Sequence, residues 1–250
     1  TEQLMVYGTY SEGFKSGGVQ QRNAGRFGPS APTYDPEFVE SFEVGFKYRS
    51  EGGSFVLNGA AFMADYTDIQ LETLAPEGIA PQLDNAGEGE IEGIELESRW
   101  SPAPGWFFEG SFGYLDATIV EADPSVTNSG GPAAGDRLPQ VPEVTAALSA
   151  IKEFDLNSGG VITARIDFAY RDLVYFAPDN DPFSVMPSYE RLNASLAWNS
   201  ASDRLGVQLH LMNITDERIT LYTEASGSSG TQNDILARDF AWYVTAEYRF

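Results

Sequence analysis

The sequence predicts an all-β chain, and three observations lead to that prediction. Apolar and polar residues alternate over long segments, most regularly at 239–250, where one face is entirely apolar or aromatic. That alternating face consists of Phe240, Trp242, Val244, Ala246, Tyr248 and Phe250. Long and short connections alternate along the chain, and aromatic residues flank the short ones. Together these features predict a transmembrane antiparallel up-and-down β-barrel, with short turns at one end and long loops at the other.

The alternation predicts ten strands, and no segment has a helical pattern strong enough to predict a helix. Several of the segments are about twice as long as a typical strand of a soluble sheet. The expected strands cover residues 2–13, 37–50, 54–70, 89–101, 106–119, 141–154, 160–173, 188–199, 204–214 and 239–250.

The connections between these strands alternate strictly in length. The long ones are 15–36, 71–88, 121–140, 176–187 and 215–238, and the short ones are 51–53, 102–105, 155–159 and 200–203. A soluble sandwich has no reason to gather its long loops at one end, whereas an outer-membrane barrel has long external loops and short periplasmic turns.

Aromatic residues lie next to the short turns. We expect Tyr48, Trp100, Trp106 and Trp198 to form an interfacial girdle, because aromatic rings favour the level of the lipid headgroups. Phe154 occupies an equivalent position.

Composition excludes several classes of protein. The formal net charge of −22 makes nucleic acid an improbable partner, because binding depends on neutralising phosphates. With no cysteine and a single histidine, His210, the chain has no cysteine-based zinc site, iron–sulfur cluster or thiol nucleophile. No metal site, cofactor or catalytic residue is predicted.

Seven motifs, in order, resemble those of TonB-dependent outer-membrane receptors. They are Y-x-x-Y-S-x-G-F-K-S-G-G at 7–18, P-E with S-F-E-V-G at 36–45, D-Y-T-D-I-Q at 65–70, N-A-G-E with G-I-E-L-E at 85–97, L-P with Pro142 at 138–142, N-I-T-D-E at 213–217 and Y-R-F at 248–250. The resemblance implies a 22-stranded barrel with an N-terminal plug. This chain would then supply about ten C-terminal strands, without the plug.

The resemblance also implies a function. Family members import scarce, bulky nutrients across the Gram-negative outer membrane, most often ferric siderophores, and they are not enzymes. The implied partners are the TonB complex, acting through the absent N-terminal region, and a ferric siderophore or similar iron complex. Outer-membrane lipid, lipopolysaccharide and the barrel-assembly machinery are also implied. The terminal Tyr248 and Phe250 resemble the signal that this machinery reads.

The loop 15–36 is the only long loop with a positive net charge, because Lys15, Arg22 and Arg26 outnumber Asp35. Arginine suits anionic, oxygen-rich ligands such as ferric catecholates. We therefore expect Arg22 and Arg26 to bind ligand, with Phe27 and Tyr34 stacking on its aromatic parts.

Most of the acidic excess lies outside the long loops, and we expect it to face the barrel lumen, including Glu88, Glu90 and Glu92. A plug would then carry compensating basic residues. Asp179 to Asp181 lack the spacing of a calcium loop and predict a turn. The sequons at Asn193 and Asn213 are expected to carry no sugar.

Two readings of other classes stay open. The chain could be a self-contained ten-stranded outer-membrane barrel, either a porin or an enzyme that uses His210, although G-x-S-x-G is absent. It could also be a soluble secreted β-protein that binds carbohydrate.

Overall fold

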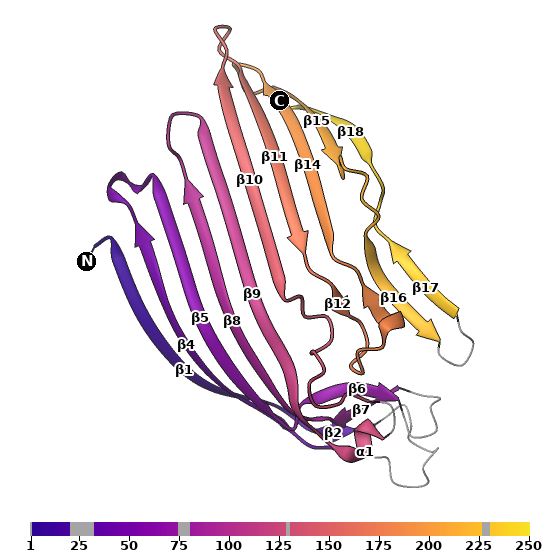
Figure 1. The fold of residues 1–250 in the computed structure, drawn as a ribbon. Coiled ribbons are helices and arrows are strands. Elements are labelled where there is room, and N and C mark those ends of the chain that lie inside the picture. Colours follow the sequence, from indigo (N-terminus) through magenta and orange to yellow (C-terminus); the bar gives the residue numbers. More distant parts are fainter. Residues whose placement is uncertain (1, 21–32, 75–80, 129–130, 227–230) are drawn as a thin grey trace.

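The chain forms one large curved antiparallel sheet, shown in Figure 1. The computed structural model describes residues 2–20, 33–74, 81–128, 131–226 and 231–250. No helix among these residues is long and apolar enough to cross a membrane.

Ten strands make up the sheet, in chain order and with each strand next to its neighbour. They are β1 (Leu4–Lys15), β4 (Glu37–Arg49), β5 (Phe55–Thr67), β8 (Gly87–Trp100), β9 (Trp106–Ala122), β10 (Val144–Asp155), β11 (Val161–Arg171), β14 (Tyr189–Asn199), β15 (Leu205–Met212) and β18 (Ala241–Tyr248). This order is the up-and-down arrangement that the alternation predicts. β1 and β18 are the two edges of the sheet.

All the long connections lie at one end of the sheet, which we call the loop end, and the short ones lie at the other, the turn end (Figure 1). Four long connections contain small two-stranded sheets. These pair β2 (Gly18–Val19) with β3 (Thr33–Tyr34), β6 (Gln70–Leu74) with β7 (Pro81–Asn85), β12 (Val174–Tyr175) with β13 (Val185–Met186), and β16 (Thr220–Ser226) with β17 (Thr231–Leu236).

The described residues also include three short helical segments: η2 (Glu51–Gly53), α1 (Pro124–Thr127) and η3 (Pro182–Ser184). The expectation of no helix was therefore wrong at α1. Its start is local, because Pro124 occupies the first turn and the Asp123 carboxylate accepts a hydrogen bond from the Ser125 amide at 2.7 Å.

Several expected strand ends differ from the observed ones, and left-handed residues explain two of them. The strand expected at 54–70 stops at Thr67 because Asp68 has φ +55°, and the one expected at 204–214 stops at Met212 because Asn213 has φ +50°. The strand expected at 141–154 begins only at Val144, after Pro142. β1 extends two residues beyond the expected 2–13, and the last strand is shorter than 239–250.

Cross-strand partners assign the side chains to two faces, because directly paired residues point to the same side. One face is apolar along the middle of all ten strands. It includes Val6, Phe42, Ala61, Leu96, Phe112, Leu148, Ile166, Leu196, Leu209 and Val244. Many of these side chains are exposed in the isolated sheet, as expected of a surface that meets lipid.

The opposite, polar face carries charges of both signs in nearly equal number. Its strand residues include the acidic Glu37, Glu43, Glu95, Glu97, Glu109, Glu153, Asp155, Asp167 and Glu247 and the basic Lys15, Lys47, Arg49, Arg99, Arg165, Arg171 and Arg191.

The expectation that the acidic excess faces the lumen was wrong. On the strands, the unbalanced carboxylates share the apolar face near the loop end: Glu12, Glu40, Asp65, Glu90, Glu92, Asp116 and Glu190. A membrane strand needs about 9–11 residues, whereas β9 has 17, so its end projects beyond the hydrocarbon and can carry charge on either face. The polar face therefore does not call for a plug with a large basic excess.

The buried apolar cluster lies at the loop end, over the polar face of β5, β8 and β9. It joins Ile69, Ala86, Ala117, Ile119, Val126 and Leu138. Ile119 is the largest of these side chains that is almost fully buried, with 1% of its surface exposed. Residues of the 68–86 and 123–143 connections thus pack against the polar face of the sheet at its loop end.

Candidate ligand-binding mouth

The connection between β1 and β4 has a tightly closed neck, formed by residues 16–18 and 34–36. A Cβ atom on Gly17 would lie 2.5 Å from the Tyr34 carbonyl oxygen, and one on Gly18 would lie 2.5 Å from the Tyr34 hydroxyl. The contact at Gly17 is with backbone, so that position requires glycine, whereas a side chain at Gly18 would displace the Tyr34 ring. Tyr34 is half-buried, with its ring against Gly18.

Two amide side chains of the neighbouring connection bind this neck. The Gln70 Nε2 group donates to the carbonyl oxygens of Asp35 at 3.0 Å, Ser16 at 3.2 Å and Lys15 at 3.4 Å. The Asn85 Nδ2 group donates to the carbonyl oxygens of Asp68 at 2.8 Å and Asp35 at 3.0 Å. The Asn85 Oδ1 atom accepts from the Asp35 amide at 2.7 Å.

The remaining connections are joined in the same way. Asn180 exchanges hydrogen bonds with the backbone of Arg137 at 2.9 and 2.8 Å, and the Gln140 amide donates to the Tyr175 carbonyl at 2.7 Å. The rings of Phe176 and Tyr222 meet edge to face at 4.5 Å. Adjacent connections thus contact one another around the loop end.

Asn213 closes the neck of the last connection. It is buried, donates to the Glu217 carbonyl at 2.9 Å and accepts from the Glu217 amide at 3.1 Å, while the Asn193 side chain accepts from its backbone amide at 2.9 Å. The side chains of both sequon asparagines, Asn193 and Asn213, are thus engaged in hydrogen bonds with the backbone.

Asp179 and Asp181 lie in the connection between β11 and β14. Burial raises the pKa of the Asp179 carboxyl above its ordinary value, and the nearby Asp181 and Asp136 carboxylates act in the same direction. The Asp181 side chain accepts from the Phe183 amide at 2.9 Å, which caps η3. Among the described residues, no group of three or more acidic or histidine side chains is arranged to hold a metal ion.

By contrast, the pKa of Asp123 is lowered, because the Ser125 hydroxyl and amide donate hydrogen bonds to its carboxylate. At pH values above the ordinary aspartate pKa, the ionised Asp123 carboxylate therefore stabilises α1. This stabilisation is lost as the pH falls through the lowered pKa of Asp123.

Of the four residues predicted to bind ligand, the structure places Tyr34 alone, at the neck of its loop. Arg22, Arg26 and Phe27 lie outside the described residues. Their roles, and that of Tyr34, stay predictions.

The predicted girdle residues all lie on the apolar face at the turn end, paired with other strand residues. Trp100 and Trp106 each lie within 6 Å of the Phe108 ring, at 5.5 and 5.7 Å between centroids, and Tyr48 lies 6.3 Å from Phe55. Trp198 pairs with Ile162 and Val207. Their contact with lipid headgroups stays a prediction.

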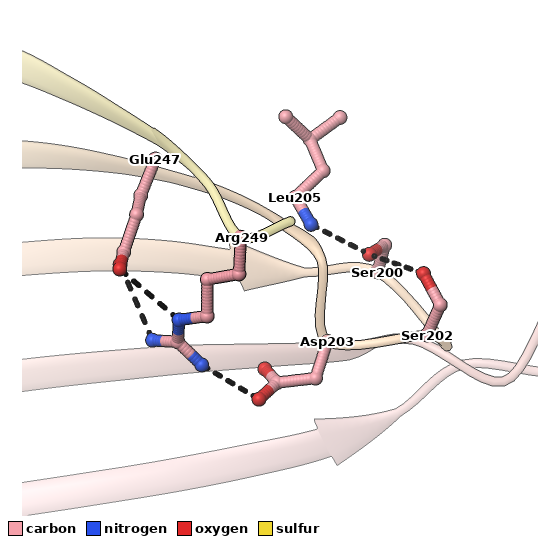
Figure 2. Close-up of polar contacts among 6 residues, drawn as sticks. All are labelled: Ser200, Ser202, Asp203, Leu205, Glu247 and Arg249. Atoms are coloured by element: carbon pink, nitrogen blue, oxygen red, sulfur yellow. Dashed lines mark hydrogen bonds and ion pairs between the residues drawn. The ribbon is translucent and has the colours of Figure 1, made fainter.

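The C-terminus is tied to the last turn, as Figure 2 shows. The Arg249 guanidinium donates to Asp203 at 2.6 Å and to Glu247 at 3.0 and 3.2 Å, and its backbone amide donates to the Arg204 carbonyl at 2.8 Å. Phe250 is fully exposed and meets Tyr248 edge to face at 5.1 Å. Their role as an assembly signal stays a prediction.

Side chains on the polar face of the sheet form hydrogen bonds and ring contacts with one another. The Arg165 Nε group donates to both Asp167 carboxylate oxygens at 2.8 Å, and Ser149 contacts both residues. His210 stacks on Tyr243 at 4.3 Å, with Thr245 Oγ1 3.5 Å from its Nε2 atom.

An antiparallel sheet with one lipid-type face, one polar face, and long connections gathered at one end defines part of an outer-membrane β-barrel. The family model described as "TonB dependent receptor-like, beta-barrel" matches residues 1–214. The chain belongs to this family, whose members lie in the outer membrane of Gram-negative bacteria.

Several known proteins are similar to this chain. It is 28% identical over 238 residues to a pesticin receptor of Yersinia enterocolitica, covering 95% of this chain and 33% of the relative. It is 25% identical to the probable TonB-dependent siderophore receptor PiuA of Acinetobacter baumannii, covering 91% of this chain and 30% of the relative. The chain thus spans about a third of the length of these curated relatives.

Solved structures share the fold. The ferric yersiniabactin uptake receptor FyuA from Yersinia pestis aligns over all of this chain and 35% of its own, with a TM-score of 0.81 and 23% identity. BauA, the ferric preacinetobactin receptor from Acinetobacter baumannii, aligns over 98% of this chain and 34% of its own, with a TM-score of 0.69 and 20% identity.

Sequence reasoning missed the amide side chains that close the loop necks. Gln70, Asn85 and Asn213 lie inside motifs that resemble those of the family, but the motifs by themselves predict no role for these side chains. The signal available was their position: Gln70 lies at the end of the strand predicted at 54–70, Asn213 lies near the end of the one predicted at 204–214, and Asn85 lies shortly before the one predicted at 89–101.

Proposed function

We propose that the receptor containing this chain imports a ferric siderophore across the outer membrane, energised by the TonB complex. The observation that carries the proposal is the family match over residues 1–214, because related receptors are described as siderophore receptors. FyuA is described as an uptake receptor for ferric yersiniabactin and BauA as a receptor for ferric preacinetobactin. We further propose contacts with membrane lipid, lipopolysaccharide and the assembly machinery, and no enzymatic activity.

We infer that the chain supplies about ten C-terminal strands of a 22-stranded barrel. In support, β1 and β18 end the sheet as edges, whereas a self-contained ten-stranded barrel would pair them. Open edges are templates for further pairing, so additional strands suit both sides. The contacts of His210 with Tyr243 and Thr245 are those of a structural side chain, which disfavours the enzyme alternative.

The experiment is uptake of radioactive iron by cells that express the full-length receptor. Iron would be supplied as ferric yersiniabactin, ferric preacinetobactin, ferric pyoverdine or a tris-catecholate complex. We expect uptake of at least one complex to require both the receptor and TonB. Receptor-independent uptake of all four would contradict the proposal.

Arg22→Ala and Arg26→Ala should each lower affinity for an anionic ferric complex by at least about tenfold, because a charge-assisted hydrogen bond is worth roughly 1.5–3 kcal/mol. Binding would be measured by fluorescence quenching of the purified full-length receptor. Arg204→Ala, at the turn end, is the matched control and should bind like the wild type. Unchanged affinity in both loop variants would refute these assignments.

A further inference from the structure

Gln70 lies where three separate segments meet. Its Nε2 group contacts carbonyl oxygens at both ends of the 15–36 loop, Lys15 and Ser16 at its start and Asp35 at its end. Its backbone amide donates to the Glu37 carboxylate at 2.7 Å, which attaches the same residue to the start of β4. One side chain thus joins the two ends of the loop.

The orientation of this amide is fixed by its surroundings. Gln70 is 6% exposed, and its Oε1 atom is buried with no hydrogen-bond partner among the described residues. A buried acceptor without a partner is unfavourable, yet a flipped amide would direct that oxygen at three carbonyl oxygens. The contacts made by Nε2 therefore determine how the side chain sits.

Asn85 adds a second, independent attachment. It binds both backbone polar groups of Asp35 and also the Asp68 carbonyl, so the end of the loop is joined to the end of β5. Gln20, also buried, donates from its side chain to the Leu83 carbonyl, which joins β7 to the residue after β2. The β6–β7 pair thus holds the β2–β3 pair from one side.

We infer that Gln70 and Asn85 are positioning residues that staple the β2–β3 pair to the β6–β7 pair and thereby place Tyr34 for ligand binding. The consequence for ligand binding rests on the proposed function; the staple itself does not. If Tyr34 occupies its binding position for only a fraction of the time, the apparent association constant for the ligand is reduced to that fraction of its intrinsic value.

The test uses the full-length receptor in lipid bilayers, with a nitroxide attached at Val19→Cys. Val19 is exposed on β2, and residues 1–250 contain no cysteine to compete for the label. Gln70→Met removes the amide at similar size. Asn85→Asp keeps the acceptor for the Asp35 amide and replaces the donor. The matched control is Gln82→Met, because the Gln82 amide bonds to Asp84 within its own strand at 2.6 Å.

We expect both staple variants to increase label mobility and to weaken binding of ferric yersiniabactin or a tris-catecholate iron complex about tenfold, while the control changes neither. Heat-modifiable migration of the barrel would show that each variant is folded. Unchanged mobility in folded Gln70→Met and Asn85→Asp receptors would overturn the inference, as would unchanged affinity in a receptor that binds either complex. If the wild type binds neither complex, the proposed function fails in that form, and mobility alone decides the staple.

Discussion

Gly87→Ala should destabilise the folded receptor by at least about 3 kcal/mol, because two penalties coincide at this residue. Gly87 begins β8 with φ +127°, a conformation that L side chains rarely adopt. A Cβ atom there would also lie 1.9 Å from the Glu121 carbonyl oxygen. The backbone cannot simply retreat, since the Gly87 carbonyl accepts the Ile69 amide at 2.9 Å.

The measurement is urea unfolding of the purified full-length receptor, followed by tryptophan fluorescence. Gly52→Ala separates the two penalties, because Gly52 has φ +78° but no atom within 4 Å of its Cβ position. That control should cost only about 1 kcal/mol. Equal losses in the two variants would show that the contact with Glu121 is unimportant.

Leu148→Arg should cost about 2–4 kcal/mol, the penalty for a cation near the bilayer midplane on the lipid face of a barrel. Leu148 lies in the middle of β10 on the apolar face, between Gly110 and Phe168, and is 58% exposed in the sheet. Lipid is the environment that makes this exposure favourable.

Ala147→Arg is the matched control one residue away. Ala147 points to the polar face, where it lines a hollow with Asn58 and Ser149, so a long cationic side chain has polar surroundings. We expect a loss below about 1 kcal/mol. The two variants would be compared by the same unfolding measurement in lipid vesicles, and a larger loss at Ala147 would reverse the assignment of the faces.

Strands could be predicted because their signal is periodic. Each alternating segment spreads its information over many residues, so the ten strands and their order followed from the sequence alone. The alternation between long and short connections then assigned the two ends. Boundaries such as Asp68 and Asn213 depend on single left-handed residues, and periodicity carries no such information.

The missed features depend on contacts between distant segments. Gln70 and Asn85 act on residues up to 55 and 50 positions away, which no local pattern reveals. The assignment of Glu90 and Glu92 to the lumen failed for a different reason. Their parity matches that of Ile94 and Leu96 on the apolar face, so the alternation itself already placed them there.

The central claim is that the apolar face of the ten-stranded sheet meets lipid. The most direct test is a nitroxide scan of β11 from Ile162 to Tyr170, with single cysteines in the full-length receptor in bilayers. Accessibility to oxygen, which concentrates in lipid, would be compared with accessibility to a water-soluble nickel complex. We expect a period of two, with the even-numbered residues favouring oxygen. Even-numbered residues that favour nickel, or an absence of periodicity, would contradict it.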